Sequence, residues 1–468
     1  MSGGEFSQNN EKFIRMTSAP VERVVFSLAV PSIAIMLISS LYNVADTYFV
    51  SSLGTSQAAA VGVAFPLMAI IQAMGFFFGQ GSGNFMARAL GARDVEGASC
   101  MAATGLVSGF VVMAAIAGVG IAVLGSLTGA LGATPTITPF AEEYILFILL
   151  ASPWMVAATV LNQQLRFQGN AAVAMTGMLS GAVLNIFLDP LFIFVFRMGV
   201  KGAAIATMIS QIVSFCILFF YGSRRKGSIP VRLRHFSPSA QRYAEMFRGG
   251  VPALLRQSLM SVASVVINHF ARPYGDAAIA AISISNRIAM FATSVVLGFG
   301  QGFQPVCGFN YGAKLYSRVR KSFWFCVRFC CGALFVISIV IAVFAPRIIA
   351  LFRRDDLEVI AIGALGLRFQ CVSLPFTAAI IMINMMTQTM GKALEASVIA
   401  LSRQGLFLLP SLFVLAPFLG LNGIQLARPV SELASLVVVV PIMLKVLKVL
   451  SAPDGTGGGG GRTVESFE

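Results

Sequence analysis

Two aspartates stand inside segments that are otherwise apolar enough to cross a membrane. Asp46 lies in the first such segment, three and four residues after Asn43 and Tyr42, and Asp189 lies in the fifth, four residues after Asn185. Residues three or four apart share one helix face. A charged side chain at the bilayer centre costs roughly 2.5 to 3.5 kcal/mol on insertion scales, so such acids are expected to face a protein interior or an ion path.

The expected depths of these residues bring them to one level. The first and fifth segments both run outward, and at about 1.5 Å per residue the two acids lie roughly 6 to 10 Å below their outer ends. Thr207 has a similar depth in the sixth segment. Two carboxylates in a poorly solvated region cannot both ionise cheaply, because burial and repulsion penalise the second charge. We predict a coupling site for H⁺ or Na⁺, with Tyr42 and Asn43 as supporting groups, made of Asp46, Asn185, Asp189 and Thr207.

Each acid alone could instead be a structural hydrogen-bond anchor. No metal is expected beyond Na⁺ at the coupling site, and no cofactor, because the seven cysteines show no metal-ligand spacing and only two histidines accompany them. The cysteines fall almost entirely in apolar segments and are interpreted as small core residues.

Composition predicts an all-α polytopic membrane protein. Of 468 residues, 57% are hydrophobic and 11% are charged, against about 25% charged residues in an average soluble domain; mean hydropathy is +0.83. The first sixteen residues lack the apolar core of a signal peptide. A span needs about 20 apolar residues, and twelve segments qualify: 24–50, 57–79, 99–124, 141–162, 175–196, 202–222, 250–271, 277–303, 322–344, 360–387, 396–417 and 423–447.

The net charge of +14 is interpreted loop by loop, because Lys and Arg favour cytoplasmic loops. The densest basic cluster lies at 223–249. A nucleic-acid patch is the alternative, but no helix-turn-helix or aromatic-basic module accompanies it. We therefore expect both termini in the cytoplasm, with no nucleic-acid partner.

An internal repeat divides the chain. Val30-Pro31 recurs as Val251-Pro252, and Phe78-Gly79-Gln80-Gly81 recurs as Phe299-Gly300-Gln301-Gly302, both 221 positions later. Six spans are thus duplicated in the same orientation, which predicts two lobes with a cavity between or within them, a common transporter plan. The fold we expect is two six-helix bundles that form a V-shaped cavity. A duplicated scaffold without transport is the alternative. The expected divisions are a cytoplasmic segment 1–23, an N-lobe 24–222, a basic linker 223–249, a C-lobe 250–449 and a flexible tail 450–468.

The repeat leaves the acids unmatched. Asp46 corresponds to Ile267, and Asp189 to Pro410 or Ser411, so ion chemistry is expected in the N-lobe alone. In the C-lobe, Arg428 and Glu432 are expected to form an i,i+4 pair near the outer surface. The candidate substrate cavity there comprises Asn268, His269, Asn384, Gln388, Arg256 and Met290.

Other roles are open for these cavity candidates. The amides and the histidine could join helices to one another, and Arg256 could snorkel toward the interface.

From about Val24 to Leu447 the chain resembles the multidrug and toxic compound extrusion (MATE) family. The motifs that carry the resemblance are Asn43-Val44-Ala45-Asp46, Gly79-Gln80 repeated as Gly300-Gln301, Gln304-Pro305 followed by Asn310-Tyr311-Gly312-Ala313, Arg166-Phe167-Gln168-Gly169-Asn170, and Asn185 with Asp189.

The resemblance implies a cation-coupled pump that exchanges external H⁺ or Na⁺ for cytoplasmic, mostly cationic amphiphilic drugs. In one branch of the family the coupling site uses an Asp of span one, an Asn and an Asp of span five and a Thr of span six. By match these are Asp46, Asn185, Asp189 and Thr207. Another branch uses acids in spans seven and ten, which contain none here.

We therefore predict a monomeric multidrug antiporter in the cell inner membrane, in contact with lipid, and not an enzyme. A flippase for a lipid-linked saccharide or a similar amphiphile is the alternative. It would be favoured if Arg256, Arg287 and Arg403 all faced a basic central cavity. A membrane-embedded enzyme or receptor is a third possibility, but no nucleophile or Cys-His constellation supports an enzyme.

Overall fold

The computed structural model describes residues 3–51, 53–224, 229, 231–352 and 356–455; side chains at 3–10, 39–48, 50–51, 55, 223–224, 233 and 276 lie outside the description. Every regular element within these ranges is a helix. The elements are α1 (Gly3–Ser18), α2 (Val21–Ser51), α3 (Thr55–Gly91), α4 (Val95–Ala122), α5 (Leu124–Ala130), α6 (Thr138–Phe167), α7 (Ala171–Pro190), η1 (Leu191–Val195), α8 (Gly199–Arg224), η2 (Leu233–His235), α9 (Ala240–Ala271), η3 (Arg272–Tyr274), α10 (Gly275–Gly312), α11 (Tyr316–Ala350), α12 (Leu357–Thr389), α13 (Ala393–Leu401), η4 (Ser402–Leu406) and α14 (Leu408–Val449).

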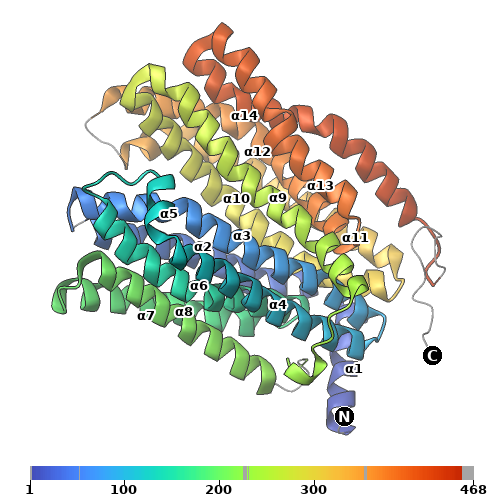
Figure 1. Ribbon diagram of the computed structural model, residues 1–468. Coiled ribbons are helices and arrows are strands. Elements are labelled where there is room, and N and C mark those ends of the chain that lie inside the picture. Colours follow the sequence, from blue (N-terminus) through green and yellow to red (C-terminus); the bar gives the residue numbers. More distant parts are fainter. Residues whose placement is uncertain (1–2, 52, 225–228, 230, 353–355, 456–468) are drawn as a thin grey trace.

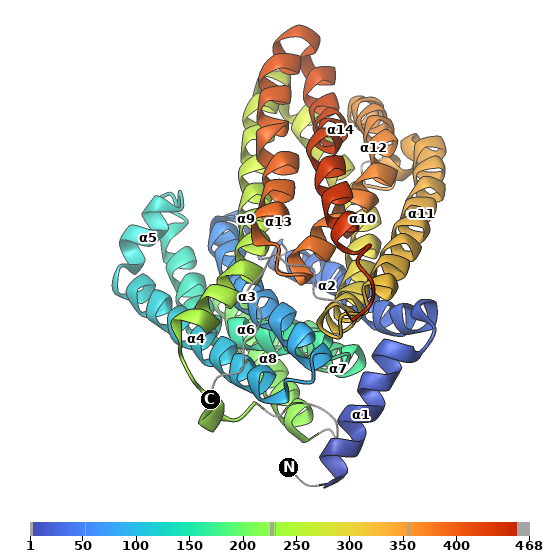
Figure 2. The same cartoon turned by 90° about the vertical axis from the view of Figure 1, so that its right-hand side faces the viewer.

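The spanning helices form two groups (Figures 1 and 2). We call α2 to α8 the N-lobe and α9 to α14 the C-lobe. The lobes meet where α2 packs against α10 and where α3 packs against α9 and α10. Helix α1 and the last turn of α14 lie at the same end of the molecule, which we call the α1 end (Figure 1).

The twelve-span, two-lobe architecture is confirmed once α14 is divided. Eleven stretches are long and apolar enough to span a membrane, but the last covers Ala393–Val449, 57 residues. Gly420 interrupts it with φ 57° and ψ −134°, a conformation that favours glycine. A Cβ at Gly423 would collide with the Leu415 carbonyl, so the chain reverses tightly here and forms two spans.

Several helices run farther than the apolar pattern suggests. Helix α9 begins at Ala240, inside the expected linker, because Ser239 caps it by accepting a hydrogen bond from the Arg242 backbone N–H (3.3 Å). Helices α3 and α10 continue to Gly91 and Gly312. Their added turns are polar and glycine-rich and pack against the opposite lobe, so hydropathy alone ends them too early.

Helix α1 contacts both lobes. Its Met16 carbonyl accepts from Asn310 Nδ2 of α10 at 3.1 Å, and the Arg93 guanidinium, beside α4, lies 4.6 Å from the Phe13 ring centroid. The following Ala19 carbonyl accepts from Arg318 of α11 at 2.7 Å. The amino-terminal segment therefore contacts both lobes at the α1 end of the molecule.

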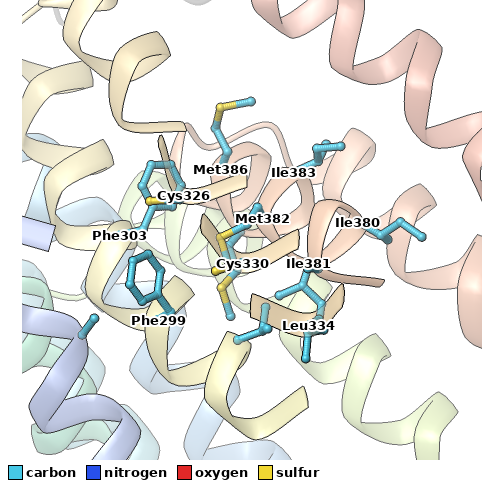
Figure 3. Packing of buried hydrophobic residues seen from close by; sticks show 14 of the residues in the cluster. Phe299, Phe303, Cys326, Cys330, Leu334, Ile380, Ile381, Met382, Ile383 and Met386 are labelled. Carbon is cyan, nitrogen blue, oxygen red and sulfur yellow. The ribbon is translucent and has the colours of Figure 1, made fainter. Parts of the chain in front are cut away.

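The C-lobe core is built between α10, α11 and α12 (Figure 3). Phe299 and Phe303 of α10 face Cys326 and Cys330 of α11, and all four are buried. The first half of α2 joins this same core through residues such as Val25. Helix α2 therefore belongs to the N-lobe in sequence but packs on both lobes.

Candidate functional site

The structure brings three of the predicted coupling residues together inside the N-lobe. Asp189, Asn185 and Thr207 are each 1–2% exposed. In the amide orientation that satisfies both polar atoms of Asn185, its nitrogen donates to Asp189 Oδ2 (2.8 Å) and its oxygen accepts from the Thr207 backbone N–H (3.2 Å). Asn185 thus links a buried carboxylate of α7 to α8.

Local sequence explains why Asp189 stands at a break in its helix. Pro190 has no N–H to continue the α-helical ladder, and the chain passes into the π-helical turn η1, closed by Phe196 N–H donating to the Leu191 carbonyl (2.9 Å). Such turns are frequent at functional sites. A Cβ at Gly202 would lie 2.8 Å from the Phe192 carbonyl, so this glycine lets α8 approach and places Thr207 opposite Asn185.

Asp46, Tyr42 and Asn43 lie on α2, but their side chains are outside the described residues. The helix itself is placed: α2 packs against α7, and the rings of Phe49 and Phe194 meet at 6.5 Å between centroids. Phe49 is one turn after Asp46, and Phe194 follows Asp189 by five residues. The predicted convergence of the two acids stays a prediction.

Two of the C-lobe cavity candidates are buried and hydrogen-bonded. Asn384 Nδ2 donates to the Ala396 carbonyl at 2.7 Å, and the repeat contains the same bond, from Asn162 Nδ2 to the Ala174 carbonyl at 3.0 Å. This duplication favours the helix-joining role for Asn384.

Gln388 lies at the lobe interface. Its Nε2 donates to Gln80 Oε1 of α3 (2.8 Å) and to the Gly249 carbonyl of α9 (2.7 Å). It therefore joins the lobes.

The remaining candidates lie on α9 and α10. Asn268 and His269 are exposed, Arg256 is half-buried, and Met290 is 57% exposed. Asn268 shares a helix face with Gln257, whose Nε2 donates to Gln72 Oε1 of α3 at 3.4 Å. Since that face points toward the N-lobe at Gln257, helical periodicity places Asn268 on the same side of α9, three turns farther along.

The lobes are joined most closely near the α1 end. Arg88 of α3 donates from Nη1 to the Thr389 carbonyl and from Nη2 to Glu245 Oε2, both at 2.8 Å. Cβ atoms at Gly91 and Gly312 would collide with the carbonyls of Phe309 and Arg88, so α3 and α10 touch by their backbones. The repeat contained a signal that Arg88 is special, because the equivalent residue in the second half is Phe309. The two hydrogen-bond partners of Arg88 could not be identified from sequence spacing.

The expected Arg428–Glu432 pair is wrong. Glu432 is 5% exposed and accepts from Arg403 Nη2 at 3.1 Å and from Thr377 Oγ1. Arg428 Nη1 instead donates to Asn286 Oδ1 at 3.0 Å. Thr377 lies well inside α12, so Glu432 is an acid in the C-lobe interior, which the sequence had placed near the surface. The i,i+4 spacing predicted the wrong pair because η4, in another span, places the Arg403 guanidinium next to the Glu432 carboxylate.

Comparison with known proteins identifies the family. A sequence model of the MatE family matches residues 31–191 and 252–414, which together make up more than half of the chain. The two matches begin 221 positions apart, as the internal repeat does. The chain belongs to the MATE family. The expectations of a membrane transporter and not an enzyme are confirmed by this membership.

Two curated MATE relatives cover nearly the whole chain. It is 27% identical over 424 residues to the multidrug export protein MepA of Staphylococcus haemolyticus, covering 90% of this chain and 93% of the relative. It is also 27% identical over 437 residues to MepA of Staphylococcus aureus strain MSSA476, covering 92% and 96%.

Solved MATE structures superpose closely. An outward-facing multidrug resistance MATE transporter of the MOP superfamily has a TM-score of 0.88 at 27% identity, covering 94% of this chain and 99% of that one. A MATE protein in a bent conformation has a TM-score of 0.87 at 27% identity, covering 93% and 98%.

Proposed function

We propose that this chain is a multidrug efflux transporter that exchanges H⁺ or Na⁺ for amphiphilic, mostly cationic drugs by alternating access. The buried Asp189–Asn185–Thr207 set carries the proposal, together with Asp46 on the neighbouring helix. A carboxylate so far from water gains a great deal from binding a proton or a small cation. The amide and hydroxyl oxygens nearby suit either ion.

The lobe contacts support an outward-facing state. Arg88, Gln388 and the glycine contacts hold the lobes together at the α1 end, whereas Asn268 and Met290 are exposed on the helices beyond. With the α1 end in the cytoplasm, an ion from outside can reach the N-lobe while the cytoplasmic side is closed. Both termini would then be cytoplasmic, in a monomer in the cell inner membrane.

Helix α2 is the proposed mechanical link between ion and drug. Helix α2 packs against α7, where the rings of Phe49 and Phe194 lie 6.5 Å apart, and its first half is part of the C-lobe core. Ion occupancy that reshapes α2 therefore changes the lobe interface. If the ion weakens drug binding, drug must weaken ion binding by the same factor.

The C-lobe arginines weigh against the flippase alternative. Arg403 is engaged by Glu432 inside the lobe, so it does not add an unpaired positive charge to the space between the lobes. Arg256 is half-buried and Arg287 is exposed. Drug efflux remains the better supported cargo assignment.

Transport from loaded vesicles tests this proposal. Efflux of a fluorescent cation is measured with a pH gradient and a Na⁺ gradient imposed separately, for the wild type, Asp46→Asn and Asp189→Asn. We expect both variants to lose the response to the coupling ion.

Asp94→Asn is the matched control. Asp94 is exposed and caps α4 by accepting from the Gly97 N–H at 2.7 Å, a role that Asn also fills. It should transport normally. Ion-driven efflux that survives in both test variants would rule out this coupling site.

A further inference from the structure

Arg166 of α6 carries a buried charge that has no carboxylate partner among the described residues. Its side chain is 1% exposed, and none of the ion pairs among those residues includes it. Its Nη2 donates to the neutral side-chain oxygen of Gln163, one turn earlier on the same helix, and its Nε is buried with no acceptor. The neighbouring charge that acts on it is a second guanidinium, Arg256 of α9.

The position of Arg166 places this charge against the C-lobe. Helix α6 packs against α10. The next residue, Phe167, lies in the same hydrophobic cluster as Phe303 and Met386 of the C-lobe core. Contact between the lobes therefore contributes to keeping water from the Arg166 guanidinium.

The repeat shows what the equivalent position does in the C-lobe. Arg166 corresponds to Gln388, 222 positions later. Gln388 crosses the junction and donates from Nε2 to Gln80 Oε1 at 2.8 Å. Gln80 corresponds to Gln301, 221 positions later, so the equivalent bridge would join Arg166 to Gln301. Gln301 Oε1 is instead buried without a donor, and only one of the two equivalent bridges is formed.

The residue one turn before Arg166 accounts for this difference. Gln163 corresponds to Met385, and the two side chains occupy equivalent places, each against a glycine of the neighbouring helix, Gly79 and Gly300 respectively. The Gln163 oxygen holds the Arg166 guanidinium on its own helix. Met385 offers only a weak sulfur acceptor, so the side chain that follows it is free to reach the opposite lobe.

We propose that Arg166 opposes closure of the lobes at the α1 end and is a positioning residue for the transport cycle. Burying a guanidinium without a carboxylate costs free energy, and that cost is relieved when the lobes part and water reaches the Nε atom. Arg166 thus acts in the opposite sense to Arg88 and Gln388, which join the lobes. This role rests on the alternating access proposed above, but it involves neither the coupling ion nor the drug.

Hydrogen–deuterium exchange of the full-length protein in detergent tests this role. Amide exchange reports rare openings of a folded structure, here in peptides from the facing ends of α3 and α10, residues 80–91 and 301–312. Arg166→Gln removes the charge and supplies an amide that can donate to Gln301 Oε1, as Gln388 does to Gln80. Exchange in these peptides should slow at least about tenfold.

Two further variants separate charge from side-chain shape. Arg166→Met removes the charge without adding a donor, and it should slow exchange by a smaller factor than Arg166→Gln. Arg166→Lys keeps the charge and is the matched control, in which exchange should not slow. Peptides of α4, which packs on α3 and α6 within the N-lobe, report general stability and should be unchanged in all three variants.

Unchanged or faster exchange at the junction in the two neutral variants would overturn the proposal. Loss of folding in both would do the same, because it would show that the charge stabilises the closed state. Equal slowing in α4, or in Arg166→Lys, would assign the effect to general stability or to side-chain shape instead. Because no drug or ion gradient is used, a failure here would leave the Asp189 assignment intact, and loss of that assignment would not alter this result.

Discussion

Among the side chains that the structure describes, each lobe buries one carboxylate, and the hydrogen-bond partners of the two carboxylates differ in charge. Asp189 in the N-lobe is hydrogen-bonded by the neutral amide of Asn185. Glu432 in the C-lobe is bonded by the guanidinium of Arg403 and by Thr377. A carboxylate beside an amide responds strongly to an arriving proton or cation, whereas one held by a guanidinium is already compensated. In the proposed coupling scheme, one duplicated scaffold carries an exchangeable charge in the N-lobe and a charge pair in the C-lobe.

Glu432→Gln should give the largest effect, and it acts on stability. Removing one partner of a buried ion pair leaves Arg403 uncompensated, which costs about 3–5 kcal/mol. Thermal unfolding in detergent measures this, while the ion dependence of drug efflux should persist. The double variant Arg403→Met, Glu432→Leu removes both charges and should recover most of the loss. A stable Glu432→Gln protein that has lost ion coupling would reverse the roles of the two lobes.

Asp189→Asn should act on coupling instead. The ratio of drug affinities with and without the coupling ion should collapse by about 5–150-fold, the usual range of coupling between two sites. Stability should change little, because Asn can still bond with Asn185. Drug binding titrated at high and low ion concentration measures the ratio; an unaltered ratio would remove Asp189 from the site.

Arg88→Gln tests the junction between the lobes. It removes a partly exposed ion pair with Glu245 and a bond to the Thr389 carbonyl, so closure of the α1 end should weaken by about 1–2 kcal/mol. Distances between spin labels on α4 and α11 at that end should show a larger open population. Arg248→Gln is the control, because Arg248 is exposed and pairs with Glu245 within its own helix. Identical distance distributions in Arg88→Gln and the wild type would show that this bridge does not hold the lobes.

Asn162→Ala and Asn384→Ala should give the smallest effect, and an equal one. Each side chain makes the same bond to the carbonyl twelve residues ahead, and its loss should cost about 0.5–1.5 kcal/mol. Unfolding midpoints of the two variants should agree. A much larger loss in one lobe would show that the scaffolds differ as the sites do.

Much of this arrangement could be predicted from residue patterns. Apolar length predicted twelve spans, and the repeat predicted two lobes. Helix spacing and depth predicted that Asn185 and Asp189 share a face and that Thr207 lies level with them. These inferences worked because helical periodicity fixes the face and the height of a side chain along its own span.

The partners across helices could not be predicted. Periodicity does not say which span stands opposite, so the Arg403–Glu432 pair was assigned to the wrong arginine. Gln388 was left open between a cavity role and a helix-joining role, because its partners on α3 and α9 could not be identified from spacing. The path of α2 across both lobes also depends on packing that no local pattern contains.

The glycine contact between α3 and α10 bears on how readily the lobes can part. At Gly91 and Gly312 the two helices meet backbone to backbone, because neither glycine places a side chain between them. Interdigitated side chains would each have to leave the opposing helix before the lobes could separate. Two backbone surfaces in direct contact can separate without a rearrangement of side chains between them. The contact between α3 and α10 can therefore be close in the closed state and still have a low barrier to opening.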